Sequence, residues 1–254
     1  MITVRNIYDN LCELAPVETQ MGFDNAGFLL GHIDAPVKKV ILALDITEEV
    51  IDEAINLGAA LIVSHHPLIF TPLKSLTDCG SGKKALRMAE NHIAAICMHT
   101  NLDIAQGGVN DVLIKLLGAE ALEALDEENC GRIGELKEKM SLESFLQMSK
   151  AALKCKGIRY FNAGRDVKRI AVMGGSGADD IETAFNKGCD TYLTADIKYH
   201  QFQLAQDLGM NLIDADHFYT ENPIIYELQD RLSGAFPETE FIVSAKHKAL
   251  IDFI

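Results

Sequence analysis

The sequence predicts an α/β protein with parallel sheets and two similar halves. Short segments rich in Val, Ile and Leu alternate with helix-length amphipathic segments, which is typical of strands joined by helical connections. A pattern of strand, helix and strand recurs about 130 residues further along the chain, which indicates an internal repeat. The chain has 254 residues, enough for one large domain or for two lobes.

The first half contains the clearest predicted elements. In chain order they are strand 39–44, helix 47–57, strand 61–64, helix 83–91 and strand 93–98. Thr47 can cap the first of these helices, and Gly58 can end it in the left-handed conformation. The run 61–64 (LIVS) is apolar almost throughout, as expected for a strand that is buried on both faces.

The second half repeats this pattern at a nearly constant offset. Gly188 falls opposite Gly58, segment 191–194 falls opposite 61–64, and segment 211–214 takes the place of 95–98 with a shifted register. Two generic strand–helix–strand units could align in this way, but we expect a duplication. The predicted lobes are residues 1–126 and 127–254, and a helix is expected at 141–153 within the second.

Composition restricts the classes of partner and the compartment. The formal net charge of −14 disfavours binding of nucleic acid over a broad surface, because such a surface repels phosphates. The six cysteines are scattered without a C-x-x-C pair, which indicates a reducing compartment. Neither a signal-peptide core nor an apolar segment of membrane-spanning length is apparent, so we expect a cytoplasmic protein that does not bind membranes.

Metal-binding residue types follow three predicted strands. His65 and His66 follow the strand 61–64, "HTNLD" (99–103) follows 93–98, and "DHFYTE" (216–221) follows 212–215. Functional groups collect beyond the carboxyl ends of parallel strands, so these side chains are expected to meet. Imidazole and carboxylate donors without thiolate suit Zn, Fe, Mn, Ni or Co. Pro67 favours an extended backbone at His66, so the adjacent rings diverge, which suits two ions better than one.

Several weaker features have two interpretations. A single histidine after a strand is usually a hydrogen-bonding residue, and an H-x-x-x-E spacing is common by chance. The "GGSG" loop at 174–177 is expected to be a tight turn, with an anion cradle as the alternative. Asp24 and Asn25 lie in a Gly-flanked stretch that turn chemistry explains, although an active-site loop is the alternative. Asp196 and His200 are candidates for a hydrogen-bonded pair beside the metal.

The motifs together resemble the NIF-three-like family, also called GTP cyclohydrolase 1 type 2 homologues. The resemblance extends over nearly the whole chain and rests on these stretches: "DNAGFLLG", "VSHHPLIF", "HTNLD", "GGSG", "LTADIKYH" and "DHFYTENP". It implies two α/β lobes with a dinuclear metal site in the cleft between them, and a ring-like homohexamer. It also implies the metal ligands, which are His65, His66, Asp103, His217 and Glu221.

The ligand set predicts a metal-dependent hydrolase. Two divalent ions would activate a water for attack on a small anionic, nucleotide-like substrate such as GTP. His99 is the candidate general acid or base, and its alternative role is to orient Asp103. The alternative functions are a phosphoesterase or nucleotidase, and a non-catalytic metal-binding, metallochaperone or scaffold protein. The absence of a nucleophile elbow and of a P-loop disfavours serine acyl transfer and P-loop NTP hydrolysis.

Overall fold

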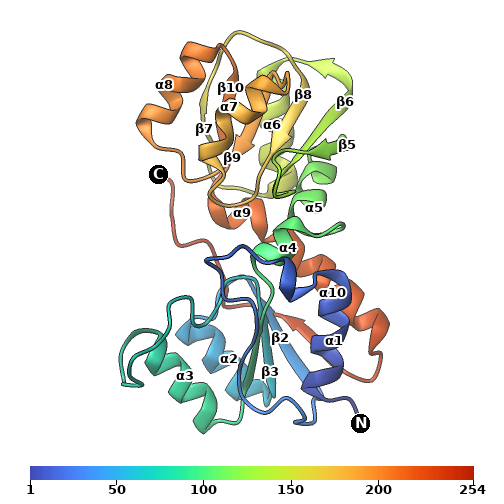
Figure 1. Cartoon of the computed structure of the whole chain (residues 1–254), viewed down its shortest axis with the longest axis vertical. Helices are drawn as coiled ribbons and strands as arrows, with labels where there is room; N and C mark the ends of the chain where they lie inside the picture. Colours follow the sequence, from blue (N-terminus) through green and yellow to red (C-terminus); the bar gives the residue numbers. More distant parts are fainter. The chain divides into compact units, whose positions relative to one another are not determined.

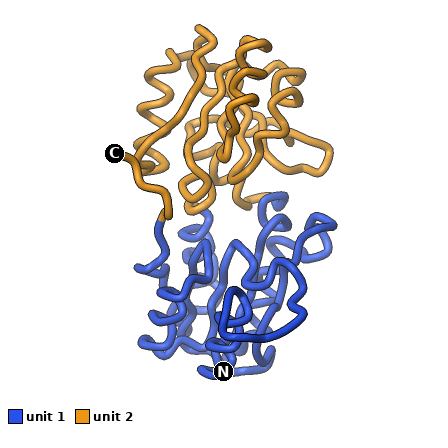
Figure 2. The backbone as a smooth tube through the Cα atoms, turned by 90° about the vertical axis from the view of Figure 1, so that its left-hand side faces the viewer, with its two compact units in different colours: residues 1–105, 224–248 blue, residues 106–223, 249–254 orange.

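The structure is a computed structural model that describes residues 1–254, and the chain divides into two compact units. Unit 1 comprises Met1–Ala105 and Ile224–Lys248, and unit 2 comprises Gln106–Pro223 and Ala249–Ile254 (Figure 2). This division differs from the single boundary after residue 126 that the sequence predicts. The chain leaves unit 1 about 20 residues earlier and later returns to it, a course that local sequence patterns do not reveal.

Unit 1 is built on a five-stranded sheet with the order β1-β4-β3-β2-β11. The parallel strands are β2 (Lys39–Ala43), β3 (Leu61–Ser64), β4 (Ala94–Cys97) and β11 (Glu240–Val243). The remaining strand, β1 (Gly27–Leu30), pairs with β4 in the antiparallel direction. The prediction of a parallel sheet is therefore correct for the centre of this unit and wrong for its edge at β1.

Helices cover both faces of this sheet. They are α1 (Val4–Leu14), α2 (Glu48–Leu57), α3 (Gly80–Glu90), α4 (Thr100–Ile104) and α10 (Pro223–Ala235), with a 3-10 turn, η1 (Val17–Thr19). In Figure 1, α2 and α3 lie on one side of β2 and β3, and α1 and α10 lie on the other. The sheet is thus buried on both faces, which explains why β3 is an uninterrupted apolar run.

The helix α2 forms where the sequence predicts it. The hydroxyl of Thr47 accepts a hydrogen bond from the Val50 N–H, 3.3 Å away, and Gly58 ends the helix with φ of 67°. Its apolar face packs with Ile62 of β3 and Met88 of α3 in one buried cluster. This packing holds the carboxyl ends of the strands in place, and the candidate site begins at those ends.

Unit 2 is built on a six-stranded mixed sheet with the order β5-β6-β8-β9-β10-β7. Its central strands β8 (Val167–Val172), β9 (Thr191–Thr194) and β10 (Asn211–Asp214) are parallel. The others, β5 (Ala119–Ala124), β6 (Arg132–Met140) and β7 (Arg159–Phe161), are antiparallel to their neighbours. The sequence does not predict these three strands, because their charged and exposed residues obscure the apolar pattern.

The remaining elements of unit 2 are α5 (Val109–Leu116), α6 (Leu142–Leu153), η2 (Ala178–Asp180), α7 (Ile181–Asn186), α8 (Tyr199–Leu208) and α9 (His217–Glu221). The predicted helix at 141–153 corresponds to α6, with Ser141 as its cap. None of the helices in the chain has the length and apolar character needed to cross a membrane.

The two sheets share a topology that supports the predicted repeat. The parallel strands β2, β3 and β4 of unit 1 correspond to β8, β9 and β10 of unit 2, and an antiparallel strand pairs with the last of each set, β1 with β4 and β7 with β10. The N–H of Ala60 donates to the Lys39 carbonyl, and the N–H of Asp190 donates to the Arg169 carbonyl at the corresponding position. Gly58 and Gly188 both adopt positive φ, at 67° and 79°.

Candidate metal centre

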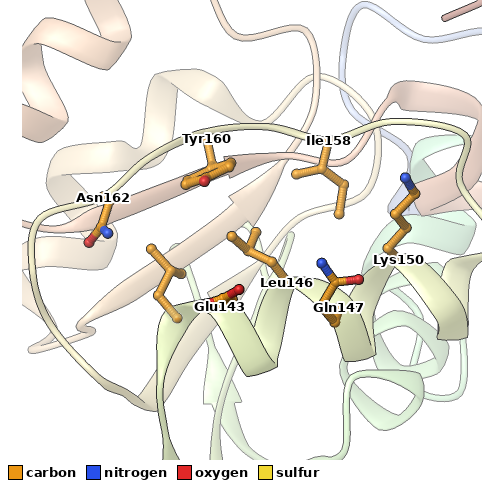
Figure 3. Close-up of a pocket in the computed structure, with 8 residues that line it drawn as sticks. Glu143, Leu146, Gln147, Lys150, Ile158, Tyr160 and Asn162 are labelled. Carbon is orange, nitrogen blue, oxygen red and sulfur yellow. The ribbon is translucent and has the colours of Figure 1, made fainter.

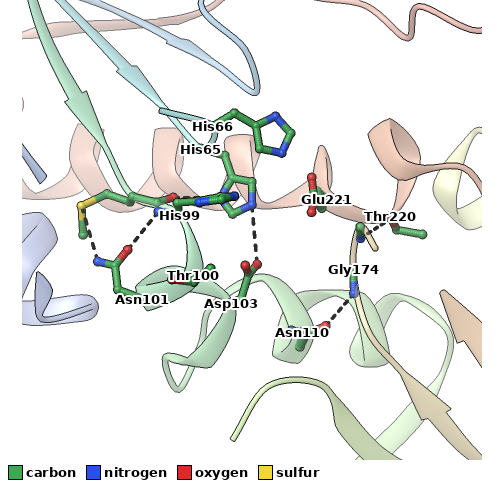
Figure 4. Close-up of polar contacts among 12 residues, drawn as sticks. His65, His66, His99, Thr100, Asn101, Asp103, Asn110, Gly174, Thr220 and Glu221 are labelled. Atoms are coloured by element: carbon green, nitrogen blue, oxygen red, sulfur yellow. Dashed lines mark hydrogen bonds and ion pairs between the residues drawn. The ribbon is translucent and has the colours of Figure 1, made fainter. Parts of the chain in front are cut away.

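Three imidazoles of unit 1 cluster at the carboxyl ends of β3 and β4. His65 and His66 follow β3, and His99 precedes α4 at the end of the segment that contains β4. The potential ligand atoms of these three side chains lie within 4.8 Å of one another. In addition, Nε2 of His65 lies 3.5 Å from Oδ1 of Asp103 on α4 (Figure 4). The structure therefore brings together the predicted site residues of the first half of the chain.

The first two imidazoles are oriented by oxygen atoms at Nδ1. Nδ1 of the fully buried His65 lies 2.8 Å from the carbonyl oxygen of Met98, which can only accept a hydrogen bond. Nδ1 of His66 lies 2.8 Å from Oδ1 of Asp45, directly after β2. Because each Nδ1 carries the proton, Nε2 of a neutral ring presents a lone pair, which is the form that binds a metal ion.

His99 is oriented by a buried carboxylate. Its Nδ1 lies 2.7 Å from Oδ1 of Asp24, and Oδ2 of Asp24 accepts hydrogen bonds from the N–H and hydroxyl of Thr100. Burial raises the pKa of Asp24, but these hydrogen bonds outweigh burial and hold the pKa well below its usual range. Asp24 is therefore ionised, and its hydrogen bonds join the Gly-flanked loop to His99 and Thr100. The backbone N–H of Asp103 donates to the carbonyl oxygen of His99, 3.1 Å away.

The ligand pair of unit 2 lies on α9. Nε2 of His217 lies 3.0 Å from Oε2 of Glu221, one helical turn away, and Nδ1 of His217 lies 2.8 Å from Oδ2 of Asp196. Asp216 caps α9 by accepting the N–H of Phe218. The partner of Asp196 in the structure is thus His217, whereas the sequence suggests His200. The positive φ of Asp196, 54°, marks the sharp turn after β9 on which its carboxylate meets His217.

The loop Gly174–Gly177 packs against His217 and Glu221. Gly174 N–H donates to Asn110 Oδ1 (Figure 4), Gly175 N–H donates to Thr220 Oγ1, and Gly177 N–H donates to Thr194 Oγ1, at 2.8 to 3.0 Å. Since these N–H groups have side-chain partners, the structure favours the tight turn that the sequence predicts over an anion cradle.

Gly175 approaches the ligand pair more closely than any other residue type could. It adopts φ of +64°, and a Cβ placed on it would overlap Oε1 of Glu221 and lie 3.1 Å from Nε2 of His217. Glu221 itself is only 4 % exposed, so its carboxylate has little room to move away. A glycine is therefore required at this position for the two ligand side chains to keep their arrangement.

Each unit thus presents its own set of nitrogen and oxygen donors. Unit 1 contributes His65, His66, His99 and Asp103, and unit 2 contributes His217 and Glu221. Imidazole nitrogen and carboxylate oxygen donors suit first-row divalent ions. A hydrogen bond between Nδ1 and an oxygen atom orients each of the four imidazoles. The sequence analysis does not single out Asp45 as a partner of His66. The one indication in the sequence is its position just beyond a buried strand.

A separate hollow of about 440 Å³ lies in unit 2 between α6 and β7 (Figure 3). Its floor and walls include Leu142, Leu146, Ile158 and Tyr160, with Glu143 and Lys150 also lining it. None of the predicted site residues lines this hollow, so it is distinct from the candidate metal centre.

Comparisons with known proteins found a matching family model, similar sequences and similar solved structures. A family model described as Duf34/NIF3 (NGG1p interacting factor 3) matches residues 2–249. A GTP cyclohydrolase 1 type 2 homolog from Clostridium perfringens is 35% identical over 99% of each chain. Among solved structures, the Staphylococcus aureus hypothetical protein SA1388 superimposes with a TM-score of 0.92 at 29% identity over 99% of each chain. Reduced HcgD from Methanocaldococcus jannaschii gives 0.85 at 29% identity, covering 95% of this chain and 97% of that one.

Proposed function

This chain belongs to the Duf34/NIF3 family, and from that premise we propose that it is a dinuclear metal-dependent hydrolase of a small anionic, nucleotide-like substrate. Many relatives carry the name GTP cyclohydrolase 1 type 2 homolog, which supports a nucleotide as the substrate class. The ring-like homohexamer remains a prediction, and sedimentation of the purified chain would test it.

We assign five side chains as the metal ligands. They are His65, His66, Asp103, His217 and Glu221. The observation that carries the assignment is that His65, His66 and His217 each have an oxygen atom 2.8 Å from Nδ1, while Asp103 and Glu221 lie 3.5 and 3.0 Å from Nε2 of His65 and His217. A histidine that only fills space needs no such constraint, whereas metal-binding histidines almost always have one.

Bound divalent ions would lower the pKa of a water towards about 7 and so supply a nucleophile at neutral pH. Their charge of about +4 exceeds the charge of the carboxylates Asp103 and Glu221, which favours an anionic substrate. His99 is the proposed general acid or base, because ionised Asp24 keeps the proton on Nδ1 and leaves Nε2 able to accept another.

The experiment that tests this function is metal analysis combined with a substrate screen. We expect the purified or reconstituted chain to hold two divalent ions, and expect turnover of a nucleotide to stop with a chelator and resume when metal is restored. Formate as the product indicates ring opening, and free phosphate indicates a phosphoesterase. Turnover that is indifferent to chelation would contradict the proposal, and bound metal without turnover of any nucleotide would leave only the metal-binding alternative.

Asp24→Asn tests the orientation of His99. The asparagine amide can offer an N–H to Nδ1, which favours the opposite tautomer, and the variant also lacks the negative charge. We expect turnover to fall by about 10- to 100-fold, the usual effect of removing such a partner. Asp34→Asn is the matched control, because Asp34 pairs with Arg5 on the surface. Equal turnover of both variants would show that Asp24 does not act on His99.

A further inference from the structure

Two phenylalanine rings of unit 1 are exposed beside the imidazole cluster. Phe23 is 65% exposed and Phe70 is 47% exposed, although both are large apolar side chains. Their ring centroids are 6.4 Å apart with an angle of 60° between the planes. Phe23 directly precedes Asp24, and Phe70 lies four residues after His66. The burial of apolar area that normally places phenylalanine inside a protein does not explain either ring.

The backbone that carries these rings is held firmly. The Asn25 side chain donates a hydrogen bond to the Ile69 carbonyl, which ties the two loops to each other. The Asp24 side chain is fully buried and hydrogen-bonded to His99 and Thr100. Each exposed ring is therefore adjacent to an anchored residue, so the backbone positions of the pair are set before any ligand arrives. Preorganisation of this kind lowers the entropy lost on binding.

The pair is continuous with the proposed catalytic site. The Phe70 and His99 ring centroids are 6.2 Å apart, at an angle of 84°. The His99 ring in turn lies 5.2 Å from the ring of His65 and 5.5 Å from the ring of His66. A flat molecule that contacts Phe70 would therefore lie next to the imidazoles.

We propose that Phe23 and Phe70 form a stacking platform for a heteroaromatic ring of the substrate, such as the base of a nucleoside triphosphate. This inference rests on the proposed function and names the part of the substrate that these residues bind. Aromatic faces stack on any nucleobase because every base has a π-face. The exposed area of two rings is far below the roughly 800 Å² per partner of a stable protein interface, which favours a small planar ligand over a docked protein.

The test compares a ligand with a ring and a ligand without one. Binding of GTP and of inorganic triphosphate to the metal-loaded chain is measured by calorimetry for the wild type and for the double variant Phe23→Leu/Phe70→Leu. We expect the dissociation constant for GTP to rise by about 5- to 100-fold and the constant for triphosphate to stay unchanged. Phe70→Tyr keeps the aromatic face and is expected to bind GTP as the wild type does.

A tryptophan reporter provides a direct readout, because the chain contains no tryptophan. In Phe70→Trp, stacking of the base is expected to quench the fluorescence as GTP is added, whereas triphosphate leaves it unchanged. Leu57→Trp is the control, since Leu57 ends α2 at the opposite end of the strands from the imidazoles. Equal quenching of both tryptophans would overturn the proposal.

The outcomes separate this inference from the proposed function. If the wild-type chain binds no divalent ions, the proposed function is contradicted, whatever the result of the Phe23 and Phe70 variants. Normal metal content and normal GTP binding in the double leucine variant overturn the platform alone. Failure of the metal-loaded wild type to bind GTP or any other nucleoside triphosphate also overturns the platform. A changed sedimentation coefficient with unchanged GTP affinity would assign the rings to an interface between copies of the chain, and would overturn the platform as well.

Discussion

Gly175→Ala is expected to disrupt the ligand pair of unit 2 and to reduce the metal content below two ions per chain. The new Cβ would overlap the Glu221 carboxylate and crowd Nε2 of His217. Because Glu221 is almost fully buried, the overlap can be relieved only by moving the carboxylate or the loop that carries Gly175. Either movement destroys the arrangement that the two ligands need. We expect turnover to fall with metal content, as measured by elemental analysis and activity on the same samples.

Gly188→Ala is the matched control for this variant. Gly188 also adopts positive φ, at 79°, but a Cβ there would meet nothing within 4 Å. Both variants are therefore expected to lose roughly 1–2 kcal/mol of stability through left-handed backbone strain, but only Gly175→Ala is expected to displace the ligands. If the two variants lose stability equally but both retain two metal ions and full turnover, Gly175 has no role in arranging Glu221 and His217.

His66→Ala is expected to remove metal and turnover together while the fold persists. The loss of metal affinity should exceed the roughly 10- to 100-fold effect of removing a partner of a ligand, because a ligand itself is removed. His66 suits this test better than His65, whose full burial would leave a cavity on truncation. Its partner Asp45 has a side chain that is 45% exposed, so water can solvate the remaining carboxylate.

The measurement is the metal content of the purified variant, with circular dichroism and thermal unfolding as checks of the fold. We expect the free energy of unfolding without metal to change by only about 1 kcal/mol, the net contribution of one hydrogen bond. His32→Ala, which removes an exposed imidazole of the same unit, is the control. Wild-type metal content and turnover in His66→Ala would reject the mechanism.

The sequence predicts the centre of each unit well. The strands β2, β3 and β4 are continuous apolar runs, and their counterparts β8, β9 and β10 repeat at a nearly constant spacing, so local composition is sufficient to find them. The placement of His65 and His66 follows from the same pattern, since residues directly after a buried parallel strand must lie at its carboxyl end.

The residues that orient the imidazoles could not be predicted in the same way. Asp24 hydrogen-bonds to a histidine 75 positions further along the chain, and its Gly-flanked context resembles an ordinary turn. Asp45 and His66 are 21 positions apart and meet only because β2 and β3 are adjacent. The sequence does not predict strands β5 and β6, because each contains several consecutive exposed residues, including charged ones, that break the apolar pattern. Such features depend on tertiary neighbours, which one sequence does not reveal.

The late return of the chain to unit 1 also affects how the protein is made. Strand β11 pairs with β2, so the sheet of unit 1 is completed only after residue 243 has left the ribosome. At a translation rate of about 5–20 residues per second, one side of β2 in the nascent chain stays unpaired for roughly 10–40 s. An unpaired strand side is a template for association with other chains. Unit 2, which is nearly contiguous, can complete its sheet during that interval. Translation speed and chaperone supply should therefore influence the yield of this protein mainly through its first unit.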